Sequence, residues 1–230
     1  IRVVALTATT LYGAAQEPVI GLVGSDNVTI HHVNLGISGT GNELKLEKGF
    51  AWVNSSVTDG ANNNVFRDFS VTLSRTNTSA LGIESRVPYT PSAATGANSG
   101  NQVLNFSIKN AYQGIALNGA TAFPDQNTVI GTTVACTTGY NIIGDPAVPN
   151  DIGNTSSTTA VFGISAGTQS GIKIFNTRIT NLTNVSTGAV DGIVLGHTGS
   201  STYSTGTMEV YNNIISNLNA TSTSAAVVTG

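Results

Sequence analysis

The chain has 230 residues, of which 9% are charged and 40% hydrophobic, and its formal net charge is −3. Soluble domains usually carry about 25% charged residues, so the surface here must be built mainly from Asn, Thr, Ser and Gly. The lack of a basic stripe excludes a nucleic-acid-binding surface, and no apolar run reaches the roughly 20 residues that span a membrane.

One strand pattern recurs along the chain in phase. Its apolar positions coincide when 30–38 is laid over 66–74, at a spacing of 36 residues. The further copies are 103–110, 129–136, 174–182 and 210–218. The shortest interval, from Val103 to Val129, is 26 residues. Self-similarity at such spacing is typical of stacked repeats, in which each repeat contacts only its neighbours.

Each repeat carries a second, shorter strand in which apolar and polar residues alternate, so that one face points inward. These second strands are expected at 43–46, 82–84, 114–117, 140–143, 163–165 and 192–195. A third short strand is expected before each next repeat. No segment of ten or more residues has the 3.6-residue period of a helix, so the sequence predicts an all-β fold.

Asparagine recurs at two positions of the repeat. Asn110, Asn181 and Asn217 follow aligned isoleucines by two residues, and we expect them to form a structural Asn ladder. A second column comprises Asn105, Asn176 and Asn212, with His32 and Asp68 in the earlier repeats. Asn tolerates the left-handed backbone conformation, and stacked Asn side chains hydrogen-bond to the layers above and below. Both columns are therefore interpreted as structural.

The combined pattern is Asn-Asn-x-x-Φ-x-Asn-Φ-x-Φ followed by Gly-Ile-x-Φ, where Φ is apolar. It is carried by 62–66, 105–110, 114–117 and 191–195. Over 27–230 it resembles the right-handed parallel β-helix of the pectin-lyase-like superfamily, especially large secreted surface proteins and adhesins of Bacteroidota. The resemblance implies a solenoid of about six or seven coils.

The repeat runs nearly from end to end, so we expect a single β-helix domain over 1–230, with 1–26 as a weakly matching first coil. A solenoid hides its last apolar layer under a cap at each end. No cap is recognisable in the sequence, so the chain is interpreted as an uncapped fragment of a longer polypeptide.

Several insertions follow the second strand, at 86–100, 145–158 and 197–206. Insertions at the same point of successive repeats emerge on one face, which is often the binding face. The candidate ligand-binding residues in these loops are Arg86, Tyr89, Asp145, Asp151, His197 and Tyr203. A rigid exposed tyrosine can stack on a sugar ring, whereas Phe66, Phe69, Phe106 and Phe175 fall on strands and are expected in the core.

No catalytic residue is assigned. A calcium-dependent lyase needs several clustered carboxylates, but the twelve acidic residues are scattered and no Asp-x-Asp pair occurs. A glycoside hydrolase needs two paired carboxylates. The segment Gly196-His197-Thr198-Gly199 resembles only one of the polygalacturonase motifs, and only in part. The lone Cys136 and the unclustered His31 and His32 give no metal site, and no cofactor motif is present.

The function expected from these observations is that of a structural or adhesive module of a large secreted or cell-surface protein. Its loops would bind a surface, a glycan or another extracellular ligand, and its ends would contact the rest of its own polypeptide. The alternatives are a carbohydrate-active enzyme of the same fold, either a polysaccharide lyase or a glycoside hydrolase, and a tailspike-like fibre.

Overall fold

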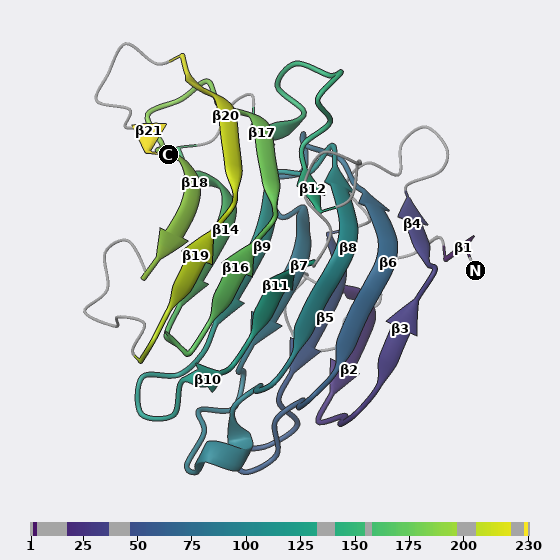
Figure 1. Cartoon of the computed structure of the whole chain (residues 1–230), viewed down its shortest axis with the longest axis vertical. Coiled ribbons are helices and arrows are strands. Elements are labelled where there is room, and N and C mark those ends of the chain that lie inside the picture. Colours follow the sequence, from purple (N-terminus) through teal and green to yellow (C-terminus); the bar gives the residue numbers. More distant parts are fainter. Residues whose placement is uncertain are drawn as a thin grey trace.

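A computed structural model describes residues 2–3, 18–36, 47–132, 141–154, 158–196, 206–221 and 228–229. Over these residues the chain is all-β, and its only helical segment is the short 3-10 turn η1 (Ala94–Gly96). Every strand pair in this part of the chain is parallel, as the repeat pattern predicts. Figure 1 shows that, within each large sheet, the strands lie side by side in chain order.

The strands form two large sheets and one small one. The twelve-stranded sheet A contains β1 (Arg2–Val3), β3 (Thr29–His31), β4 (Asn34–Gly36), β6 (Val65–Thr72), β8 (Gln102–Lys109), β11 (Val129–Gly131), β12 (Ile142–Ile143), β13 (Ile152–Asn154), β16 (Lys173–Phe175), β17 (Arg178–Asn184), β19 (Glu209–Tyr211) and β20 (Ile214–Ala220). The seven-stranded sheet B contains β2 (Pro18–Val23), β5 (Lys48–Val53), β7 (Leu81–Arg86), β9 (Gln113–Asn118), β14 (Val161–Gly167), β18 (Val190–Leu195) and β21 (Val228–Thr229). The third sheet pairs β10 (Asp125–Gln126) with β15 (Gln169–Ser170).

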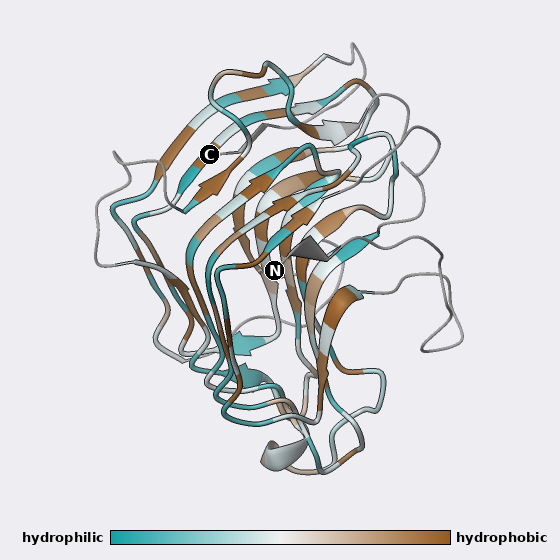
Figure 2. Ribbon diagram, turned by 90° about the vertical axis from the view of Figure 1, so that its right-hand side faces the viewer, coloured by the Kyte–Doolittle hydropathy of each residue, from teal (hydrophilic) through white to brown (hydrophobic). Residues whose placement is uncertain are grey.

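From β2 to β21 the chain alternates between sheets B and A, so each return to a sheet adds a strand beside the previous one. Hydrophobic residues recur along the strands of both large sheets, as the brown segments of Figure 2 show. Buried apolar side chains from both sheets form one core cluster. Trp52 stacks on Phe66 with ring centroids 5.0 Å apart, and both are fully buried.

Register confirms most of the predicted first strands. Ile30 pairs with Phe66, Phe66 with Val103, and Ile174 with Val210, as expected from the spacings of 36 and 37 residues.

The fourth copy, at 129–136, is confirmed as β11 over Val129–Gly131, but its register is shifted by one residue. Val103 pairs with Ile130, 27 residues on, and β11 ends at Gly131. The partners of Ser107 and Ile108 are Ile142 and Ile143 of β12. Cys136 lies outside the described residues.

The second strands predicted at 82–84, 114–117, 163–165 and 192–195 are confirmed in β7, β9, β14 and β18. The segment 43–46 lies outside the described residues, and the strand that precedes β7 in sheet B is β5, where Phe50 pairs with Ile83.

The prediction at 140–143 is wrong, because Ile142 and Ile143 belong to sheet A rather than to sheet B. Tyr140 lies outside the described residues.

A column of glycines lets the two sheets approach. Its members in successive strands of sheet B are Gly49, Gly82, Gly114, Gly163 and Gly192. A Cβ atom on Gly82 would lie 2.7 Å from the methyl carbons of Ile108 and 2.8 Å from the carbonyl oxygen of Gly114. The side chains that fill the space over this column are Val71, Ile108, Ile143, Ile179 and Ile215. Glycine is therefore required here for lack of space.

This contact predicts that Gly82→Ala destabilises the fold by about 1–3 kcal/mol, the usual cost of overpacking a filled core. Urea unfolding followed by the fluorescence of Trp52, the sole tryptophan and fully buried, measures the change. Gly36→Ala is the matched control, because no atom beyond its chain neighbours lies within 4 Å of the place that its methyl group would take, and it should change stability by less than about 0.5 kcal/mol. Equal unfolding midpoints for the two variants would contradict this view of the core.

Candidate functional site

Sheet A bends at a column of residues in the left-handed conformation. His32, Asp68 and Asn105 have φ values of 55°, 54° and 52°, and Asn176 and Asn212 continue the column with 49° and 54°. Asn, Asp and His are the non-glycine residues that enter this region most readily, which explains their choice at this position. Because neighbouring strands turn at the same point, the bend forms a groove along the sheet.

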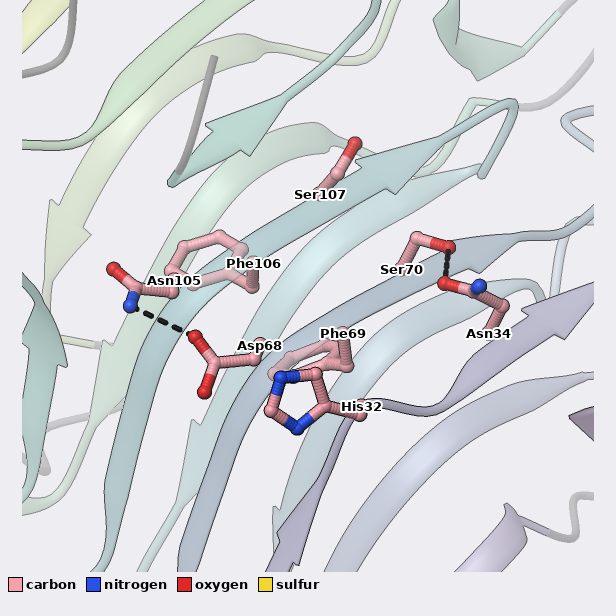
Figure 3. A pocket seen from close by; sticks show the side chains of 8 residues that line it. All are labelled: His32, Asn34, Asp68, Phe69, Ser70, Asn105, Phe106 and Ser107. Carbon is pink, nitrogen blue, oxygen red and sulfur yellow. Dashed lines mark hydrogen bonds between the residues drawn. The ribbon is translucent and has the colours of Figure 1, made fainter. Parts of the chain in front are cut away.

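The groove has a volume of about 470 Å³ and is lined by two rows of polar residues over buried phenylalanines (Figure 3). Its lining residues are His32, Asp68, Asn105, Asn34, Ser70, Ser107, Phe69 and Phe106. In the first row the Asn105 Nδ2 donates to the Asp68 Oδ1 at 2.9 Å. In the second row the Ser70 Oγ donates to the Asn34 Oδ1 at 2.6 Å. The first row thus offers imidazole, carboxylate and amide groups from neighbouring strands, and the second row offers amide and hydroxyl groups.

The groove carries little net charge. The Asp68 carboxylate pairs with the Arg67 guanidinium at 3.1 Å, and it is the one carboxylate among the described residues that line the groove. The Nδ1 atoms of the exposed His31 and His32 lie 2.6 Å apart. No group of three or more His, Cys, Asp or Glu side chains suited to a metal ion occurs in the described part of the chain. The arrangement is suited to hydrogen-bonding a neutral, hydroxyl-rich ligand.

A second groove, of about 330 Å³, lies on sheet B. It contains the Lys48–Glu84 ion pair, whose nitrogen and oxygen are 3.6 Å apart and whose side chains are both buried. Burial lowers the pKa of Lys48, and the nearby Glu84 partly opposes this shift. Gln113 and Asn118 also line this groove. Its buried charges are compensated within the protein, so it is less suited to ligand recognition than the groove on sheet A.

The structure brings Asp145 and Asp151 together. The Asp151 Oδ2 accepts the backbone N–H of Asp145 at 2.7 Å and that of Asn110 at 3.1 Å. The Asp145 Oδ2 accepts the Lys109 Nζ at 2.8 Å, and this bond is the main reason why the pKa of Asp145 is lowered. Both carboxylates hold the turn between β12 and β13, and neither lines the groove on sheet A or the groove on sheet B.

Arg86 and Tyr89 lie at the other end of the sheets. The Arg86 carbonyl accepts the Asn98 Nδ2 at 3.0 Å, and Tyr89 is 46% exposed. The backbone of Tyr89 is held by Asn54, whose Nδ2 donates to its carbonyl at 2.5 Å.

The remaining two loop candidates, His197 and Tyr203, lie outside the described residues. Because the turn of Asp145 follows β12 and the loop of Tyr89 precedes β8, the four described candidates fall into two separate groups (Figure 1).

The three expected ladder residues are all in the left-handed conformation, with φ values of 46° for Asn110, 58° for Asn181 and 55° for Asn217. The Asn217 Nδ2 donates to the Asn181 Oδ1 at 2.9 Å, and the Asn181 Nδ2 donates to the Asp145 carbonyl at 2.7 Å. The Asn110 Nδ2 donates to the Leu73 carbonyl at 2.9 Å. These bonds tie strand ends of neighbouring layers together.

Sequence reasoning missed a second, buried asparagine pair. The Asn101 Oδ1 accepts the backbone N–H of Asn64 at 2.9 Å, and the Asn64 Oδ1 accepts that of Val28 at the same distance. Asn64 and Asn101 are fully buried and stand 37 residues apart. That spacing, the same as between Phe66 and Val103, was the available signal.

Sequence reasoning also missed Asp125, which is fully buried beneath the loops. It accepts bonds from the Ser85 Oγ at 2.7 Å, the Asn98 N–H at 2.8 Å and the Gln169 Nε2 at 3.5 Å. Burial raises its pKa to about 6, although these three bonds oppose the shift. Asp125 belongs to no repeat of the apolar pattern, so no periodic signal pointed to it.

This pKa predicts how stability depends on pH. The folded pKa of about 6 exceeds the ordinary value of 3.8, so the folded state keeps its proton longer than the unfolded chain. Stability contributed by Asp125 is therefore complete below about pH 4 and falls by about 3 kcal/mol as the pH rises through 6. Urea unfolding of the natural chain and of Asp125→Asn between pH 4 and 7 measures the difference. Parallel stability curves for the two proteins would contradict the assignment.

No helix within the described residues is long and apolar enough to cross a membrane. Comparisons with protein families, curated proteins and solved structures gave no match to this chain.

Proposed function

We propose that the chain is a structural and adhesive module of a large secreted or cell-surface protein, and that it binds glycans. In this proposal the two sheets are walls of a right-handed parallel β-helix of six or seven coils. Six returns to sheet A, from β3–β4 to β19–β20, support the coil number. A right-handed path is supported because about 98% of connections between parallel strands of one sheet have that hand.

The observation that carries the binding proposal is the groove on sheet A. Its polar side chains follow one another from strand to strand at about 4.8 Å, the spacing of neighbouring strands. Sugar hydroxyls both donate and accept hydrogen bonds, so side chains such as Asn34, Ser70 and Asp68 complement them. Phe69 and Phe106 are buried beneath these polar rows and hold the floor of the groove in place.

Binding is favoured over hydrolysis by the number of carboxylates. A glycosidase of the usual kind places two carboxyl groups about 5–9.5 Å apart across the scissile bond. Asp68 has no carboxylate partner among the described residues that line the groove. Asp145 and Asp151 are already engaged by backbone N–H groups and by Lys109.

The proposal predicts that the double variant Asn34→Ala, Ser70→Ala weakens glycan binding about five- to 150-fold, because two hydrogen bonds of about 0.5–1.5 kcal/mol each are lost. A glycan array on the purified chain identifies the ligand, and titration of the best neutral hit measures the loss. Thr72→Ala is the matched control, because Thr72 is an exposed hydroxyl residue on the same strand, outside the groove. The Thr72→Ala variant should bind the glycan with the same affinity as the natural chain.

The same samples test the alternatives. Release of shorter products from neutral or acidic polysaccharides would overturn the proposal of binding without catalysis. Binding that survives the double variant but disappears in Tyr89→Ala would move the site from the groove to the loops. Absence of binding to every glycan would leave a passive structural role.

A further inference from the structure

Sheet A carries a second feature suited to sugars, which begins two strands from the groove. Phe175 at the end of β16 and Tyr211 at the end of β19 are register partners. Their rings stack with centroids 5.2 Å apart and an interplanar angle of 8°. Tyr211 is 43% exposed and Phe175 is partly exposed, so the expectation of a core position for Phe175 is wrong. The pair forms an aromatic platform.

Gly131 of β11 lies next to Phe175 on the opposite side from Tyr211. A Cβ atom on Gly131 would lie 2.3 Å from the Phe175 carbonyl oxygen and 3.0 Å from the ring. Gly131 itself therefore places no side chain beside the ring of Phe175.

The platform is neutral in charge. Lys173 and Glu209 stand two residues before Phe175 and Tyr211 on the same strands, and their side chains pair at 2.9 Å. At the other end of the column, Arg67 and Asp68 neutralise each other in the same way. An acidic polysaccharide would need uncompensated cations, whereas a neutral glycan fits both places.

The platform adjoins the same bend as the groove. Asn176 and Asn212, the residues that follow Phe175 and Tyr211, belong to the left-handed column that includes Asp68 and Asn105. The order of strands from the groove to the platform is β6, β8, β11, β16 and β19 (Figure 1). Four steps of about 4.8 Å separate Asp68 from Asn212 along the sheet, about 19 Å in all.

We propose that the Phe175–Tyr211 pair is a second subsite for a neutral glycan that also occupies the groove. The inference rests on the proposed glycan-binding function. An aromatic face stacks on the apolar face of a sugar ring, and a subsite linked to the groove through one ligand chain acts at high effective concentration. Affinity must therefore rise with glycan length, once the chain is long enough to reach both places.

The experiment compares the natural chain with Tyr211→Ala and with Tyr89→Ala, a tyrosine of similar exposure on a loop away from sheet A. The probes are gluco-, manno- and xylo-oligosaccharides from disaccharide to hexasaccharide, with oligogalacturonides as the acidic comparison. Calorimetric titration gives Kd for each. Thermal unfolding of each variant shows whether the fold is retained.

The expected result is that affinity for one neutral series rises with length in the natural chain. Tyr211→Ala should weaken binding of the hexasaccharide about three- to tenfold, and leave the disaccharide unchanged, because only the long ligand reaches the platform. Tyr89→Ala should change the affinity for neither the hexasaccharide nor the disaccharide. If the natural chain and Tyr211→Ala bind all lengths equally, the second subsite is wrong while the groove stands. If no oligosaccharide binds the natural chain, both the subsite and the proposed function are wrong.

Discussion

The close approach of the two sheets at the glycine column is the contact on which the structure depends. Sheet B can lie against Ile108 and its equivalents only because Gly82 and Gly114 have no side chain. Each layer buries the same kind of contact, so the free energy of the core is a sum of similar nearest-neighbour terms. A methyl group in one layer would displace both the isoleucine above it and the backbone of the next strand.

The bend of sheet A follows from a second local constraint, the left-handed backbone at His32, Asp68 and Asn105. Residues that tolerate this conformation are polar and short, which is why the bend that shapes the groove also lines it with hydrogen-bonding groups. Shape and chemistry of the groove therefore have one origin. The same holds at Asn176 and Asn212, beside the platform.

The sequence predicts those parts of the fold that repeat. The pairing of Phe66 with Val103 could be read from the chain because both strands are uninterrupted. The pairing of β8 with both β11 and β12 could not, because the apolar pattern gives no sign that Ser107 and Ile108 pair with Ile142 and Ile143. The segment 43–46 alternates polar and apolar residues, whereas β5 is buried throughout, so a search for alternation could not point to β5.

The groove was beyond sequence reasoning for a related reason. His32 and Asp68 could be recognised in the sequence as members of one column. A groove also needs a second row of residues opposite that column, and nothing in the sequence marks Asn34, Ser70 and Ser107 as this row. Insertions drew attention to the loops instead, where Asp145 and Asp151 turn out to hold backbone N–H groups. In a stacked fold the regular face can carry recognition, because every strand presents the same position at a fixed spacing. A ligand that is itself a repeating chain can use that spacing along its whole length, whereas irregular loops can contact it only at separate points.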